Sequence, residues 1–154
     1  MNSNPPQQPS RLSFVIPIYN GAKTIGDVVA EIHRTFPTRA IEIVLVNDGS
    51  ADDSEAVCSR LQSEHPHTVT FVHLARNFGE HGAVLAGLRQ STGDLVAILD
   101  DDGQNPPAEV ERLIATLVEE RRDVVVVRSG EPLREQRRRR QPGSLALERP
   151  HGPA

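Results

Sequence analysis

Three consecutive aspartates, Asp100 to Asp102, directly follow the apolar run "LVAIL", and Gln104 stands two residues beyond them. Adjacent carboxylates repel one another unless water, hydrogen bonds or a cation compensates their charge. Carboxylate and amide oxygens are the ligands that Mg²⁺ and Mn²⁺ prefer, and a site with few such ligands keeps coordination positions for phosphate oxygens. A solvated turn that caps the next helix is the other interpretation, so the triplet alone leaves both open.

The elements that position this triplet can be predicted from apolar patterning. Five short runs of aliphatic and β-branched residues are nearly continuous in hydrophobicity, as strands covered on both faces should be. They begin at Leu12, Ile41, Val69, Leu95 and Asp123. Between them, apolar residues recur at helical spacing, most clearly over residues 25–36 and 110–117. Alternating strands and helices predict an α/β fold, a doubly wound and mostly parallel half-sheet with helices on both faces.

Polar residues gather where the predicted strands end. The first strand runs into Pro17 and Tyr19, the second into Asp48, the third into Arg76 and the fourth into the aspartates. Open parallel sheets bind ligands outside the carboxyl ends of their strands. A carboxylate such as Asp48 can accept hydrogen bonds from a base or ribose, and Arg76 can supply a cation near a diphosphate.

Several other classes of protein are excluded or disfavoured. Neither a P-loop pattern nor G-x-G-x-x-G is present. A receiver domain needs a lysine after its fifth strand, whereas the one lysine here is Lys23 in the first predicted helix. The single cysteine, Cys58, excludes an internal disulfide and a cysteine-based zinc site. Residues 1–127 carry a net charge of −8 and residues 128–154 one of +4, so we expect no nucleic-acid partner for the acidic body.

Four segments resemble one family when taken together: "FVIPIYNGAKTI", "VLVNDGSADDS", "LARNFGEHGAVLAGL" and "GDLVAILDDDGQNPPAEV". Their order and spacing are similar to the nucleotide-binding half of family 2 inverting glycosyltransferases of the GT-A fold, with particular likeness to polyprenyl- and dolichyl-phosphate sugar transferases. The resemblance covers residues 12–127. It implies a Rossmann-like half-domain that binds a nucleotide-diphosphate sugar with Mg²⁺ or Mn²⁺.

The resemblance also implies roles for individual residues. Asp102 and Gln104 are expected to hold the divalent ion, and Asp101, between the two catalytic aspartates, is expected to face away. The remaining expectations are that Asp100 approaches the ribose or diphosphate, that Arg76 lies near the donor, and that Pro17, Tyr19 and Asp48 line the nucleoside pocket.

The implied reaction is displacement at the anomeric carbon with inversion. An acceptor hydroxyl would need a general base, whereas an acceptor phosphate is already ionised near neutral pH. The absence of an obvious base therefore does not rule out a polyprenyl-phosphate acceptor, which the resemblance implies. The alternative is a truncated, non-catalytic fragment that binds the nucleotide but lacks the acceptor site.

The two ends of the chain differ from the body in composition. Residues 1–11 are rich in Pro and Gln, and residues 128–154 in Arg and Pro, so both are expected to be disordered around the half-domain at 12–127. The Arg137–Arg140 run could bind anionic lipid or nucleic acid, but a solvated tail is favoured. The abrupt loss of pattern suggests an out-of-frame or truncated end. We therefore expect removal of residues 129–154 to leave thermal stability nearly unchanged.

Two expectations concern the environment of the protein. The fifth strand, without later elements beside it, should present an apolar edge through which copies of the chain self-associate. No apolar run is long enough to cross a bilayer, so we expect a soluble, cytoplasmic protein. A polyprenyl-phosphate acceptor would bring it to the cytoplasmic face of the membrane.

Overall fold

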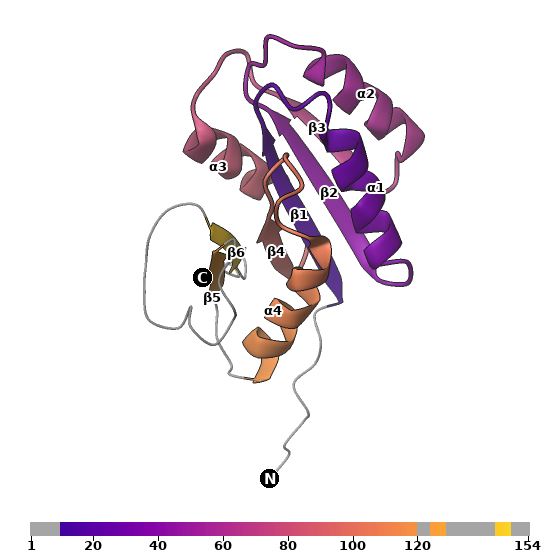
Figure 1. The fold of residues 1–154 in the computed structure, drawn as a ribbon, viewed down its shortest axis with the longest axis vertical. Helices are drawn as coiled ribbons and strands as arrows, with labels where there is room; N and C mark the ends of the chain where they lie inside the picture. Colours follow the sequence, from indigo (N-terminus) through magenta and orange to yellow (C-terminus); the bar gives the residue numbers. More distant parts are fainter. Residues whose placement is uncertain (1–9, 120–123, 129–143, 149–154) are drawn as a thin grey trace.

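The computed structural model describes residues 10–119, 124–128 and 144–148, and Figure 1 shows their arrangement. The elements follow in the order β1 (Arg11–Ile18), α1 (Ile25–Thr35), β2 (Ala40–Asn47), α2 (Ser54–Glu64), β3 (Val69–His73), α3 (Glu80–Gln90), β4 (Leu95–Ile98), α4 (Pro107–Glu119), β5 (Val124–Arg128) and β6 (Ser144–Glu148). Among these helices, none combines the length and apolarity that a membrane span requires.

The strands form one sheet in the order β3-β2-β1-β4-β6-β5. The first four in the chain pair in parallel, with β1 in the centre between β2 and β4. The predicted α/β fold with its parallel sheet is therefore confirmed. Because the strands are parallel, the loops that follow β1 to β4 all lie at one edge of the sheet.

Helices cover both faces of the sheet, which explains the continuous hydrophobicity of its strands. On one face, α1, α2 and α4 bury their apolar stripes against alternate strand residues, including Phe14, Ile16 and Leu45. On the other face, Val15, Val44 and Val46 pack against α3, which lies apart from the other helices in Figure 1. The helical periodicity predicted this arrangement: Ile25, Val28 and the other predicted apolar positions of α1 and α4 are buried.

The expectation of a disordered tail over residues 128–154 is wrong for Arg128, which ends β5, and for Ser144–Glu148. This segment forms β6, which pairs antiparallel with both β4 and β5. Without it, β4 would be an edge strand with unpaired backbone N–H and C=O groups. The short segment "SLALE" supplies hydrogen-bonding partners for that edge. Residues 129–143 and 149–154 of the predicted tail, and residues 1–9 of the predicted N-terminal segment, lie outside the described residues.

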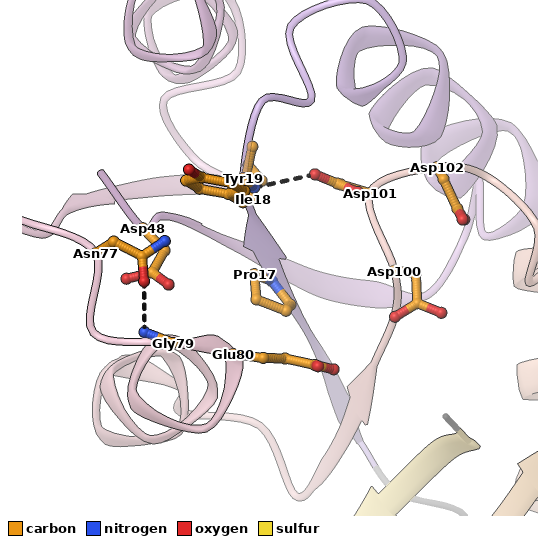
Figure 2. Close-up of a pocket in the computed structure, with 10 residues that line it drawn as sticks. All are labelled: Pro17, Ile18, Tyr19, Asp48, Asn77, Gly79, Glu80, Asp100, Asp101 and Asp102. Atoms are coloured by element: carbon orange, nitrogen blue, oxygen red, sulfur yellow. Dashed lines mark hydrogen bonds between the residues drawn. The ribbon is translucent and has the colours of Figure 1, made fainter. Parts of the chain in front are cut away.

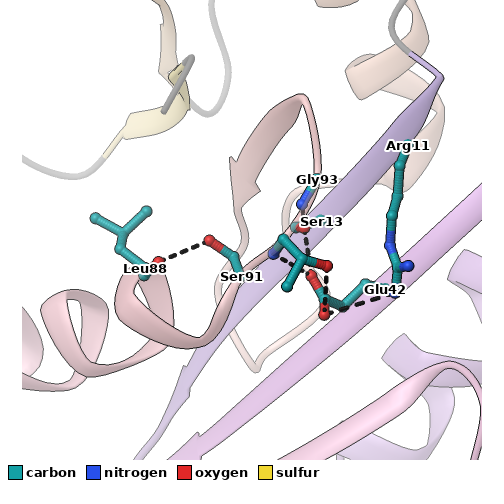
Figure 3. A network of polar contacts seen from close by, with 7 residues as sticks. Arg11, Ser13, Glu42, Leu88, Ser91 and Gly93 are labelled. Carbon is teal, nitrogen blue, oxygen red and sulfur yellow. Dashed lines mark hydrogen bonds and ion pairs between the residues drawn. The ribbon is translucent and has the colours of Figure 1, made fainter. Parts of the chain in front are cut away.

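A polar network centred on the buried Glu42 and Ser13 ties the amino ends of the strands to the loop after α3 (Figure 3). Glu42 on β2 accepts hydrogen bonds from the Ser13 hydroxyl at 2.6 Å and from the Thr92 backbone N–H at 2.7 Å. The Arg11 guanidinium lies 3.6 Å from the same carboxylate. The Ser13 oxygen in turn accepts the Gly93 N–H at 2.8 Å. This network fixes the end of α3 that lies far from the carboxyl ends of the strands.

Candidate functional site

A cavity of about 350 Å³ opens at the carboxyl ends of β1, β2 and β4, beside the start of α3. Figure 2 shows the side chains around it. Its lining residues are Pro17, Ile18, Tyr19, Asp48, Asn77, Gly79, Glu80, Asp100, Asp101 and Asp102. Five of these carry carboxylates, and none is a lysine or arginine. The cavity therefore suits a cation, or a ligand that binds together with a cation.

Five of the seven residues selected from the sequence line this cavity: Pro17, Tyr19, Asp48, Asp100 and Asp102. The other two lie outside the lining. The guanidinium of Arg76 sits 4.6 Å from the ring centroid of Phe78. Gln104 contacts the site through its backbone, whose N–H donates to Asp102 Oδ1 at 2.9 Å.

Asp101 does not face away from the cavity as we expected. Its carboxylate is turned toward the loop after β1, where Oδ2 accepts the backbone N–H of Tyr19 at 3.2 Å (Figure 2). Asp100 instead accepts a hydrogen bond from Asn105 Nδ2 at 2.8 Å. The three aspartates are thus divided among three different partners.

Sequence reasoning missed Glu80 and, although Asn77 stands at the end of the third predicted strand, gave that residue no role in the site. Glu80 is the first residue of α3, and its carboxylate extends toward Asp100 in Figure 2. Asn77 Oδ1 accepts the Gly79 N–H at 3.0 Å, which shapes the turn that leads into the helix. The available signal was the position of "RNFGE" directly after the third strand, where a helix start brings its first side chains to the same edge of the sheet.

Asp48 both lines the cavity and holds two loops together. Its Oδ1 accepts the Phe78 N–H at 2.7 Å, and the side chain is almost fully buried. The neighbouring Gly49 has φ +68°, and a Cβ there would lie 2.5 Å from the Asn77 nitrogen. Only glycine allows this close approach of the loop after β2 to the loop after β3. These contacts between the two loops shape the wall of the cavity.

The carboxylates of the cavity carry negative charge that no lysine or arginine of its lining balances. Burial raises the pKa of the Asp100 carboxyl, the charges of Asp102 and Glu80 raise it further, and the bond from Asn105 opposes these effects. Burial also raises the pKa of Asp101, with Asp102 and Asp100 adding to the shift and the Tyr19 N–H acting against it. A cation in the cavity would relieve this repulsion, so the carboxylates present fit a divalent ion.

Such an ion would take further ligands from other oxygen donors, such as an amide side chain, water or a bound phosphate. Within residues 10–119, 124–128 and 144–148, no three His, Cys, Asp or Glu side chains are grouped so that they could hold a metal alone. Mg²⁺ in particular is held in many sites by one or two carboxylates together with substrate phosphates. The donor set of this cavity is consistent with that kind of site.

Comparison with known proteins identifies the family. Residues 13–151 match the family described as "Glycosyl transferase family 2". The chain belongs to glycosyltransferase family 2. Since the match extends over most of the chain, the resemblance stated from the four sequence segments is confirmed.

Similar curated proteins are undecaprenyl-phosphate 4-deoxy-4-formamido-L-arabinose transferases. The chain is 38% identical to that of Proteus mirabilis over 121 residues, which are 77% of this chain and 37% of the relative. It is 40% identical to that of Sodalis glossinidius over 114 residues, 71% of this chain and 34% of the relative. This family 2 chain therefore spans about a third of the length of these relatives.

Solved structures share the fold at lower identity. A mannosyltransferase of Pyrobaculum calidifontis, in complex with GDP-Man and Mn²⁺, superposes with a TM-score of 0.71 and 22% identity, covering 95% of this chain and 46% of the other. S. aureus TarS 1–349 in complex with UDP-GlcNAc gives a TM-score of 0.60 at 19% identity, covering 79% and 36%. These similarities show that the family 2 chain has the fold of GT-A glycosyltransferases.

Proposed function

We propose that the cavity binds a nucleotide-diphosphate sugar, and that this chain takes part in transferring the sugar, with inversion, to a polyprenyl phosphate. One observation carries the proposal: an acid-lined cavity lies at the carboxyl ends of the parallel strands in a family 2 glycosyltransferase domain. The names of the similar curated proteins, which are undecaprenyl-phosphate sugar transferases, support the acceptor class.

The lining divides into two parts that suit the two ends of such a donor. Pro17, the half-exposed ring of Tyr19 and the Asp48 carboxylate offer apolar surface and a hydrogen-bond acceptor for the nucleoside. Asp100 and Asp102 lie across the cavity, where the diphosphate and sugar would extend (Figure 2). Arg76 lies outside the lining, so we assign it to the rim, where it would meet the donor only after a side-chain rearrangement.

Asp102, with Asp100 beside it, would hold a divalent ion, Mg²⁺ or Mn²⁺. The uncompensated charge of the cavity fits this role. A bound ion would offset the negative charge that develops on the departing nucleoside diphosphate. Gln104 stays the predicted amide ligand, and its backbone bond to Asp102 already orients that carboxylate.

Glu80 provides a test of the acceptor class. A phosphate acceptor needs no proton removed, because it is ionised near neutral pH. A hydroxyl acceptor would need a base, and Glu80 is the one carboxylate of the cavity lining that lies outside the aspartate triplet and the loop of Asp48. Replacement of Glu80 by Gln should therefore leave transfer to a phosphate largely intact and strongly reduce transfer to a hydroxyl.

Calorimetric titration tests donor binding. UDP-, GDP- and dTDP-sugars are titrated into the chain with Mn²⁺, with Mg²⁺ and with a chelator. We expect one base to bind preferentially, and more tightly with the metal. If no nucleotide sugar binds under any of these conditions, the proposed function is wrong.

Turnover separates the enzyme from a binding fragment. Release of the nucleoside diphosphate is measured with and without a polyprenyl phosphate. Release that depends on the lipid phosphate supports a transferase. Donor binding without any release supports the alternative, a non-catalytic nucleotide-binding fragment.

A further inference from the structure

We propose that Asp101 is a positioning residue that holds the loop after β1 against the loop after β4 and so sets the place of Tyr19 in the donor cavity. The effect on the donor rests on the proposed function. The contact itself is a property of the fold and can be tested without any nucleotide.

Two observations place the Asp101 carboxylate at the junction of these loops. Its Oδ2 accepts the Tyr19 N–H at 3.2 Å, which joins residues 82 positions apart (Figure 2). The same oxygen packs against Gly21, where an added Cβ would lie 2.4 Å from Oδ2 and 3.0 Å from Cγ of Asp101. The missing side chain of Gly21 therefore creates the space that the carboxylate fills.

The loop after β1 is anchored on its other side by the loop after β2. Asn20 has a φ of +55°. Its Oδ1 accepts the Ala51 N–H at 2.9 Å, and its backbone N–H donates to Ser50 Oγ at 2.9 Å. The Gly21 N–H donates to Ser54 Oγ at 3.0 Å. These bonds keep the loop near the loop after β2 in any variant of Asp101. Loss of Asp101 would thus free the Tyr19 end of the loop without unfolding the whole of it.

The consequence for the donor is a change in affinity rather than in chemistry. Tyr19 and Asp101 both line the cavity, and Tyr19 lies on the side assigned to the nucleoside. A displaced Tyr19 weakens donor contacts, while Asp100 and Asp102 keep their own partners, Asn105 and the Gln104 backbone. Asp101→Ala should therefore weaken donor binding about tenfold, with the change in KM rather than in kcat.

Substitutions at Gly21 give an independent test of the same contact. Gly21→Ala puts a methyl group where the carboxylate lies, so it should weaken binding about as much as Asp101→Ala. In the double variant the methyl group no longer meets the carboxylate, and the remaining neighbour, Ile18 Cγ2, is 3.2 Å away. The loss in the double variant should therefore be close to that of Asp101→Ala alone. Fully additive losses would show that the two residues act separately.

The Tyr19 amide reports the contact directly. Hydrogen exchange of this amide, followed by NMR, should become faster in Asp101→Ala and return toward the original rate in Asp101→Asn, which keeps an acceptor oxygen. Asp94→Ala is the matched control. Its carboxylate also accepts backbone N–H groups, from Ser10 and Arg11, but at the opposite end of β1. Asp94→Ala should leave Tyr19 exchange and donor affinity unchanged.

The outcomes separate this inference from the proposed function. Unchanged Tyr19 exchange in Asp101→Ala overturns the positioning contact, whether or not a nucleotide binds. Faster exchange with unchanged donor affinity overturns its role in binding. A wild-type chain that binds no nucleotide sugar overturns the proposed function, while the exchange measurement still decides whether Asp101 holds the two loops.

Discussion

Asp100, Asp101 and Asp102 are chemically identical, yet each has a different partner. Asp100 bonds to the Asn105 side chain, Asp101 to a backbone N–H of the neighbouring loop and Asp102 to the backbone of Gln104. A local backbone bond leaves most of the acceptor capacity of Asp102 open to the cavity, because a carboxylate has about four lone-pair positions. Asp102 therefore keeps the acceptor capacity that the proposed cation site needs, as does Asp100 beside it.

Asp102→Asn should abolish the effect of metal on donor binding. The amide keeps the oxygen that accepts the Gln104 N–H but removes the charge that would hold a divalent ion. We expect added Mn²⁺ to tighten nucleotide-sugar binding in the original chain and to have no effect in the variant. Calorimetric titration with Mn²⁺ and with chelator measures both.

Asp48→Asn is the matched comparison for that experiment. Its proposed partner is the nucleoside, so the loss, on the order of 1 to 3 kcal/mol, should be equal with and without metal. The amide oxygen can still accept the Phe78 N–H, which protects the loop geometry. If both variants lose the metal effect alike, or if the original chain shows none, the triplet is a solvated turn and the metal assignment fails.

At the scale of elements, patterning predicted the parallel core but not its extension. The periodicity of Val28 and Ile32 or of Val110 and Leu113 identifies helices because a buried stripe must repeat every 3.6 residues. β6 was missed because its five residues stand in an Arg- and Pro-rich context and pair over a long sequence distance. Such pairing depends on the open edge of β4, which no local pattern encodes.

The residues of the site, like the strands of the sheet, were predicted from the sequence only in part. Residues at the ends of strands were identified because parallel topology brings them to one edge. Glu80 was missed because the first residue of a helix reaches the cavity only through the path of the preceding loop. Arg76 was placed in the site by its charge, whereas its guanidinium stacks on Phe78.

The Glu42 network should contribute more to stability than any exposed ion pair of this chain. Glu42→Ala leaves the buried Ser13 hydroxyl and the Thr92 N–H without their acceptor and should cost about 3 kcal/mol of unfolding free energy. Urea denaturation measures the change. Glu42→Gln keeps one acceptor and should lose less; equal losses would show that the hydrogen bonds are not the cause.

The contact between α1 and the end of α2 should make stability depend on pH. His33 stacks on His65 with ring centroids 4.5 Å apart, and its ring nitrogens contact Val29 O and Thr68 Oγ1. Burial, and then the charge of His65, lower the pKa of His33 below 6.5, against the effect of the Val29 carbonyl. The unfolded chain therefore binds the proton first. This contribution is complete above pH 6.5 and decreases as the pH falls through 6.5 toward the lower value of the folded state.

Unfolding free energies between pH 7.5 and roughly pH 5 measure this dependence. His33→Gln should flatten the part of the slope that lies below pH 6.5. His67→Gln, which replaces an exposed histidine outside the stack, is the control and should leave the slope unchanged. The same slope in all three proteins would show that the His33 environment does not couple to folding.

At the scale of the whole molecule, the sheet ends differently on its two sides. β3 ends the parallel side, whereas β6 extends the sheet beyond β4 and leaves β5 outermost. Among the described strands, β5 pairs only with β6, so its other edge still corresponds to the apolar edge predicted from the sequence. An outer strand of consecutive valines can pair with a second copy of the chain. Self-association through this edge stays a prediction.

Removal of residues 129–154 tests both sides of this argument. The deletion takes away β6, so β4 loses its antiparallel partner and β5 loses the strand that attaches it to the sheet. In contrast to the expectation from the sequence alone, we expect a fall of several degrees in the melting temperature. We also expect association at lower protein concentration, since the edge of β4 becomes available as well. Differential scanning calorimetry and sedimentation velocity over a range of concentrations measure the two effects.

Removal of residues 149–154 alone, which leaves β6 intact, is the control and should change neither. A shortened chain that melts like the full chain and stays monomeric would show that β6 adds nothing to the sheet.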